Sequence, residues 1–117
     1  MNIKNYLKDN KTYFKAPVFQ LALPTEICRE LSNRLRAQRL FKNMKQQELA
    51  ERSGVSTGTI KNLETKAQVS FENFIQIVCT LGLAGELENL FNVEAQSIAD
   101  LEKIEKLKTK RLRKRAR

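Results

Sequence analysis

The segment 46–64, QQELAERSGVSTGTIKNLE, carries hydroxyl, amide and ammonium side chains in a regular order. If its second half is a helix, the apolar pair Ile60 and Leu63 marks the side that is buried. The positions left facing outwards are then Thr57, Gly58, Lys61 and Asn62. A helix with a polar outer face and a positive N-terminus fits the major groove of DNA, where such groups can bond to base edges and phosphates.

The chain has few of the residue types that enzymes and metal sites use. The chain has no His, and Cys28 and Cys79 form no CxxC pair, which excludes the usual structural zinc sites and a Ser/His/Asp set. Asp9 and Asp100 are the only aspartates, in segments that look mobile or acidic. We therefore expect no enzyme, no metal and no cofactor, and we expect both cysteines to be reduced packing residues in a cytoplasmic protein.

Two short helices and a tight turn must position the polar face. We expect the first helix at about 46–52, with Leu49 and Ala50 inward, and the second at about 57–64, capped by Ser56. Ala50 is small where the second helix presses against it. Gly54 provides the positive φ that the turn needs, and Val55 fills the junction.

A longer helix is expected to precede this pair. Pro24 opens it, with Thr25 as a possible N-cap, and Asn43 is a left-handed stop. The apolar stripe of this helix comprises Ile27, Leu31, Leu35 and Leu40, with arginines around it. These features, together with little Gly and Pro and abundant Leu, Lys, Glu and Gln, favour an all-α fold.

Two further helices complete the expected five-helix core. The fourth begins after the cap Ser70 and ends at Gly82. Its buried side is expected to comprise Phe71, Phe74, Ile75, Val78 and Cys79. The fifth is short, at about 85–91, and we expect Phe71, Phe74 and Phe91 to be core or interface residues.

The flanks of this core are expected to differ from it. Residues 1–11 are polar and expected to be mobile, while 12–23 is β-prone, with Pro17 allowing only an edge strand or an extended arm. Ser97 caps a last helix that carries Ile98, Leu101 and Ile104, and the final stretch KLKTKRLRKRAR has too few apolar residues to fold alone. We divide the chain into an arm at 1–23, a domain at 24–92, and a C-terminal helix and basic tail at 93–117. No apolar run approaches 18 residues, and the first residues lack the apolar stretch of a signal peptide.

The charge is distributed in blocks. Residues 29–66 carry nine basic and four acidic residues, residues 70–102 carry six acids and no Lys or Arg, and residues 103–117 carry nine basic residues and one acid. The whole chain has a formal net charge of +9. Such asymmetry points to a polyanion as the partner of the basic blocks, although a charge run can also be a solvated face.

Residues 31–91 resemble the lambda-repressor/Cro-like helix-turn-helix family, also called XRE-type regulators. The residues that fall on the family's pattern in register are Gln46, Leu49, Ala50, Gly54, Val55, Ser56, Thr59, Ile60, Leu63 and Glu64. The resemblance implies a five-helix DNA-binding domain in which Gln46 contacts a phosphate or bridges to a base-reading side chain. It places Ser56 and Thr59 at phosphates. It also places Thr57, Gly58 and Asn62 at base edges, with Lys61 beside them.

The family also implies a partly buried salt bridge between Arg39 and Glu64. Three positions depart from its pattern. Lys45 replaces a small N-cap and Lys66 replaces a common Gly, and each adds a cation near phosphate. Gly58 has no side chain to read a base, so specificity would depend on Thr57, Lys61, Asn62 and DNA shape.

Related domains bind DNA as two-fold dimers with half-sites about 34 Å apart. The residues available for a dimer interface here are Leu83, Leu87, Leu90, Phe91 and Ile98, which could instead only close the monomer core. The layout also resembles HipB-like antitoxins, which repress their own operon and bind a HipA-like kinase toxin. The resemblance thus implies double-stranded DNA and a second copy as partners in the bacterial cytoplasm, at the nucleoid, with no membrane. A stand-alone repressor and an antitoxin both stay open, as do DNA and an acidic protein groove as partners of the tail.

Overall fold

The computed structural model describes residues 18–115, and within them every regular element is helical. The first helix, α2 (Pro24–Phe41), follows a turn in which Leu21 N–H donates to Val18 O. Leu23, not Thr25, is the N-cap, because Pro24 occupies the first turn and Glu26 accepts a hydrogen bond from Leu23 N–H at 3.3 Å. The strand or extended arm expected at 12–23 is thus a turn at 18–22, and residues 1–17 lie outside the described part.

The two motif helices are α3 (Gln46–Ser53) and α4 (Thr57–Lys66). Gly54 ends α3 with φ +73°, and its N–H donates to Ala50 O at 3.0 Å. Ser56 caps α4 by accepting from Thr59 N–H at 3.0 Å. Both local predictions are confirmed, and the left-handed Asn43 (φ 55°) that precedes α3 is confirmed as well.

Helix α5 (Phe71–Thr80) begins after Ser70, whose hydroxyl accepts from Asn73 N–H, and Gly82 follows its end with φ +76°. The expected fifth core helix is a four-residue 3-10 helix, η1 (Ala84–Leu87). Helix α6 (Ile98–Arg115) continues through the stretch expected not to fold alone. A single helix needs only local hydrogen bonds, and Lys, Arg and Leu have high helix propensity.

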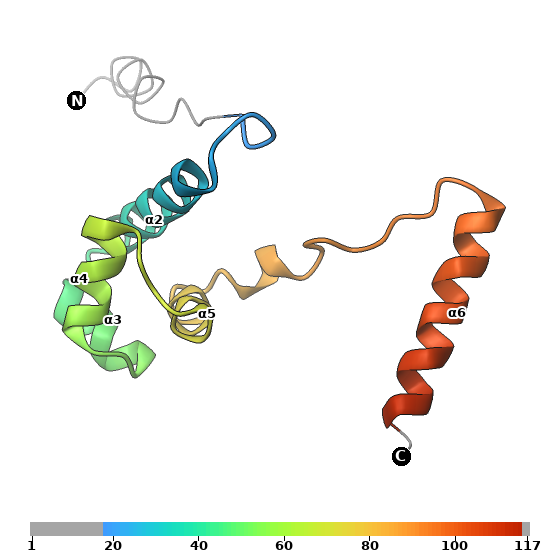
Figure 1. Cartoon of the computed structure of the whole chain (residues 1–117). Helices are drawn as coiled ribbons and strands as arrows, with labels where there is room; N and C mark the ends of the chain where they lie inside the picture. The colour runs from blue at the N-terminus through green and yellow to red at the C-terminus, as the bar shows by residue number, and fades with distance from the viewer. Residues whose placement is uncertain (1–17, 116–117) are drawn as a thin grey trace. The chain divides into compact units, whose positions relative to one another are not determined.

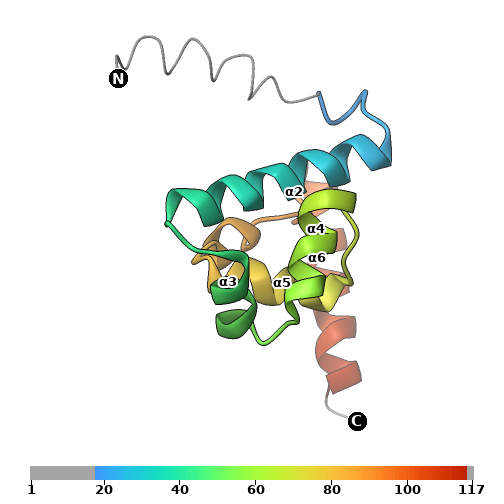
Figure 2. The same cartoon turned by 90° about the vertical axis from the view of Figure 1, so that its left-hand side faces the viewer.

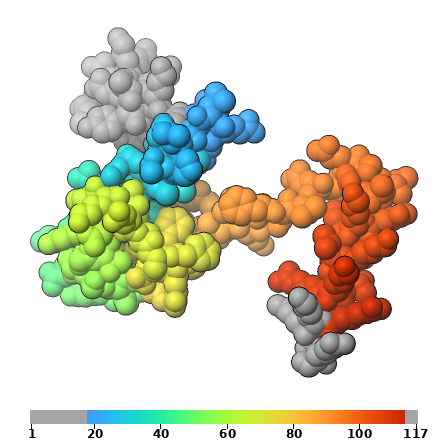
Figure 3. Space-filling model, in the orientation of Figure 1, coloured from blue at the N-terminus to red at the C-terminus, as the bar shows by residue number. Residues whose placement is uncertain are grey.

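The core lies among α2, α3, α4 and α5, which are grouped together in Figure 2. In the space-filling view of Figure 3 the same four helices form one continuous body. Its buried apolar side chains are Leu35, Met44, Leu49, Ala50, Ile60, Leu63, Ile77, Val78 and Leu81. The all-α fold class is confirmed, with five α-helices and η1 in the described part of the chain. No helix between residues 18 and 115 is both long and apolar enough to cross a membrane.

Four positions predicted to pack in the core are exposed instead. Leu40 is exposed, because the α2 position that faces the core one turn after Leu35 is residue 39. Phe71 is 81% exposed at the start of α5, and Cys79 is exposed too, while Ile77 is fully buried in their place. Cys28 is exposed on α2, so neither thiol packs in the core as expected.

The described residues fall into two units, divided between Ala84 and Gly85. The first unit contains α2 to α5, and the second contains α6, shown as one unbroken helix in Figure 1. Between Gly85 and Arg113 no residue is buried.

Candidate nucleic-acid interface

Helix α4 is anchored to the first unit by its inner face. Ile60 and Leu63 are buried against the core, and Glu64 follows them on the same side. Glu64 and Arg39 are 9% and 6% exposed, so this acid and this base are both taken out of water. A buried charge is costly unless it is paired and hydrogen-bonded, so its partners decide how firmly α4 is held.

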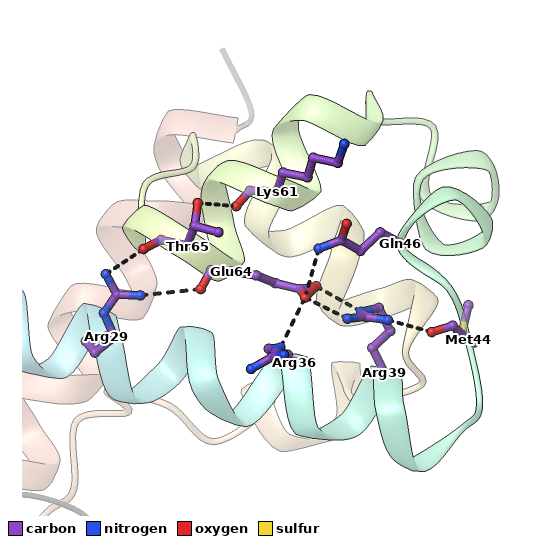
Figure 4. Close-up of polar contacts among 8 residues, drawn as sticks. All are labelled: Arg29, Arg36, Arg39, Met44, Gln46, Lys61, Glu64 and Thr65. Carbon is purple, nitrogen blue, oxygen red and sulfur yellow. Dashed lines mark hydrogen bonds and ion pairs between the residues drawn. The ribbon is translucent and has the colours of Figure 1, made fainter.

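Three side chains from two helices, α2 and α3, meet the Glu64 carboxylate (Figure 4). Arg39 donates to both of its oxygens, from Nε at 2.9 Å and from Nη2 at 2.8 Å, in the two-pronged geometry that makes such pairs strong. Gln46 Nε2 donates to Oε1 at 3.3 Å, and Arg36 Nε lies 3.6 Å from the same oxygen. The remaining guanidinium nitrogen of Arg39, Nη1, donates to Met44 O at 2.7 Å. Helices α2, α3 and α4 are thereby joined at one carboxylate.

The C-terminal turn of α4 has a second attachment. Arg29, near the start of α2, donates to Glu64 O at 3.4 Å and to Thr65 O at 3.0 Å. These carbonyls have no helical partner of their own, and a cation there also complements the negative end of the helix dipole. Lys42 does the same for α5 by donating to Leu81 O at 2.7 Å. Sequence reasoning missed both, since partners 35 to 39 residues apart leave no local signal.

The outer face of α4 is open to solvent. Gly58, Lys61 and Asn62 are exposed, and Thr57 is half-buried. Lys61 extends from the side of α4 opposite to α2 (Figure 4). None of the side chains of Thr57, Lys61 and Asn62 makes a hydrogen bond to residues 18–113. Their donors and acceptors are therefore available to a ligand that approaches this face.

The phosphate candidates lie around the ends of α3 and α4. The hydroxyls of Ser56 and Thr59 are 2.8 Å apart at the start of α4, where the helix N-terminus attracts negative charge. Lys45 is exposed just before α3 and makes no side-chain cap, while Lys66 is exposed in the last turn of α4. Gln46 is half-buried, and its amide is used in part by Glu64.

The residues expected at a dimer interface are mostly open in the single chain. Leu83 and Leu87 are half-buried, whereas Leu90 and Ile98 are exposed and Phe91 is 95% exposed with φ 58°. They fall in both units, Leu83 in the first and the others in the second.

Comparison with known proteins identifies the part of the chain that contains this site. Residues 35–87 match the family described as Helix-turn-helix. The matched range begins inside α2, contains all of α3, α4 and α5, and ends with η1. No curated protein matches the chain.

Proposed function

Over residues 35–87 the chain belongs to the helix-turn-helix regulators of the lambda-repressor/Cro-like (XRE) type, and from this premise we propose that it is a sequence-specific repressor. The family is one of DNA-binding transcription regulators. In our proposal α4 lies in the major groove, the protein acts as a homodimer, and it occludes the promoter of its own operon. The observation that carries the proposal is the open outer face of α4 above a buried, fully paired inner face.

The roles of individual residues follow from their positions. Asn62 can pair with adenine and Lys61 with guanine, and Thr57 adds a hydroxyl and a methyl group. Phosphate contacts that fix the register of α4 without carrying sequence information are proposed for Lys45, Ser56, Thr59 and Lys66. Gln46 would bond to a phosphate or bridge to a base-reading side chain. Because Gly58 presents no side chain, the backbone of α4 can approach the floor of the groove closely there.

Dimerisation is proposed through the apolar side chains that the single chain leaves exposed. Leu90, Phe91 and Ile98 lie within nine residues of sequence, and a second copy would cover them. Sedimentation of the purified protein, with Phe91→Ser as the variant, tests this: the variant should be monomeric at concentrations where the wild type is dimeric. A wild-type monomer at all concentrations would contradict the proposal.

The sequence-reading role of α4 is tested by selecting binding sites from a randomised duplex pool. The wild type should enrich one two-fold symmetric site. Asn62→Ala should lose about 1–3 kcal/mol of discrimination at one base pair, because one bidentate contact is removed. Gln47→Ala is the matched control, since Gln47 is exposed on α3 and bonds to Glu51 of its own helix. Equal loss on every sequence would show that Asn62 reads no base.

A gel shift on DNA upstream of its own gene separates the repressor from the antitoxin. Tight binding by the protein alone supports the repressor. Binding that requires a neighbouring HipA-like kinase supports the alternative, a HipB-like antitoxin whose main role is to neutralise that kinase.

A further inference from the structure

Helix α6 carries a dense set of cations that the interface on α4 does not use. The six whose side chains are described are all exposed, and they are Lys103, Lys106, Lys108, Lys110, Arg111 and Arg113. Within the described residues only Lys108 has an acidic partner, Glu105, at 3.8 Å and on an exposed surface. Solvent-exposed pairs of this kind contribute little. The acids of α6, Asp100, Glu102 and Glu105, all lie in its first half, so residues 106–115 carry positive charge alone.

The cations surround most of the helix instead of forming one face. At about 100° per residue, Lys106, Lys110 and Arg113 share one side of α6, while Lys108 and Arg111 lie on the other. Lys108 interrupts the apolar stripe that begins at Leu101 and Ile104. A helix that lies on a membrane needs a continuous apolar face, which the second half of α6 lacks. A groove with phosphates along both walls matches charge on both sides of the helix.

Building on the proposed function, we propose that α6 binds the sugar-phosphate backbone of the same duplex that α4 reads, independently of its sequence. Residues 88–97 join η1 to α6 and can span up to about 33–36 Å when extended, which is about one turn of B-DNA. Once α4 is docked, this tether keeps α6 at a high effective concentration beside neighbouring phosphates. Binding also removes the repulsion between like charges one turn apart, such as Lys106 and Lys110.

The test is the salt dependence of binding by the full chain. We compare the wild type with the triple variant Lys106→Gln, Lys110→Gln and Arg113→Gln on two 30-bp duplexes, the selected site and a scrambled one. Each lost phosphate contact reduces the slope of log K against log salt concentration by about 0.9. The slope should become shallower by about 2 to 3 on both duplexes, with the ratio of the two affinities unchanged. An unchanged slope would overturn the proposal.

Two controls separate contact by α6 from net charge. The swap Lys106→Arg, Lys110→Arg and Arg113→Lys keeps every charge and should keep the slope. Arg34→Gln with Arg52→Gln removes exposed cations that are paired to Glu30 and Glu48 in the first unit, and it should also leave the slope unchanged. A slope that falls equally per charge in this control would assign the effect to net charge and refute the role of α6.

The same measurements distinguish this inference from the function on which it rests. If the wild type shows no sequence preference while the triple variant still loses slope, the proposed function fails and phosphate binding by α6 stands. Vesicles of phosphatidylcholine and phosphatidylserine at 4:1 provide the rival surface, and poly-glutamate provides an acidic polypeptide. Tighter binding to either than to the scrambled duplex, abolished in the triple variant, would overturn the proposal.

Discussion

Helices α4 and α6 are held in opposite ways. The side-chain hydrogen bonds that tie α4 to the other helices come from distant sequence. Arg39 of α2 and Gln46 of α3 bond to the Glu64 carboxylate, and Arg29 of α2 bonds to the last turn of α4. The hydrogen bonds of α6 are local: Ser97 accepts from Asp100 N–H at 3.1 Å, and Thr109 donates to Glu105 O at 3.0 Å. One helix is fixed in orientation by a folded domain, and the other depends on its own sequence for helicity.

The difference matches what each helix is proposed to do. Reading base edges requires side chains placed within a fraction of an ångström, which only a packed scaffold provides. Contact with phosphates tolerates many positions, because the backbone of DNA presents the same charge along its whole length. In our proposals the chain thus combines a reading surface held by a packed domain with a phosphate-binding surface that does not require exact placement.

The largest effect on stability is expected when the Arg39–Glu64 pair that attaches α4 is broken. Arg39→Ala leaves the Glu64 carboxylate buried without its main partner and should lower the free energy of unfolding by about 3–5 kcal/mol. The double variant Arg39→Met with Glu64→Leu removes both charges and should recover most of that loss. Urea denaturation of the wild type, Arg39→Met, Glu64→Leu and the double variant gives the coupling between the two sites. If the single losses simply add in the double variant, the pair is not coupled.

Apolar truncations should separate the two units. Ile60→Ala in α4 leaves a cavity in the core and should cost about 2–5 kcal/mol. Leu112→Ala in α6 removes a side chain that is 66% exposed and should change stability by less than about 0.5 kcal/mol. Thermal unfolding of both variants measures the contrast. A loss above 1 kcal/mol in Leu112→Ala would mean that α6 packs against a partner in solution.

Glycine substitutions test backbone strain in each unit. Gly54→Ala should lower stability by about 1 kcal/mol because its φ is +73°, although an added Cβ meets no atom within 4 Å. Gly85→Ala meets the same open space without a positive φ, so it should be neutral or slightly stabilising. The urea midpoints of the two variants measure this difference in stability. Equal midpoints would show that the turn at Gly54 tolerates a side chain.

Removing the helix caps should give the smallest effect. Ser56→Ala removes a cap in the folded domain and should cost about 1 kcal/mol of its stability. Ser97→Ala should reduce the helical signal in circular dichroism by loosening the start of α6, without moving the main unfolding transition. A shift of that transition in Ser97→Ala would show that α6 unfolds together with the first unit.

The features predicted correctly from sequence are those with local causes. The helix caps Ser56 and Ser70 and the turn residue Gly54 act on backbone groups within a few residues. A short stretch of sequence is therefore enough to recognise them. The wrong predictions concern which side of a helix is buried, and that depends on how the helices pack. Phe71 is apolar and adjacent to a buried stripe, yet the rotation of α5 exposes it and buries Ile77. The polar residue types of the outer face of α4 could be predicted, because burial of Ile60 and Leu63 determines which positions remain.

The structure around the site was beyond prediction from spacing alone. Arg29 and Lys42 act on carbonyls 35 to 39 residues away, and only packing of the helices brings them together. Ala67 adopts a left-handed φ of 52° at the end of α4, where a Gly would have been the recognisable signal. The helix through residues 106–115 follows from the intrinsic helix propensity of Lys, Arg and Leu, which the low apolar content of this stretch does not reveal.

The pairing of Glu64 has a consequence for how such a protein can evolve. Its partners belong to the scaffold, and the side chains at 57, 61 and 62 contribute nothing to that cluster. Those positions can therefore be exchanged with little penalty to folding. If their side chains read base pairs as proposed, such an exchange would change the DNA sequence that the protein prefers. The residues that hold α4 in place and the residues that face outwards from it can therefore change independently of one another.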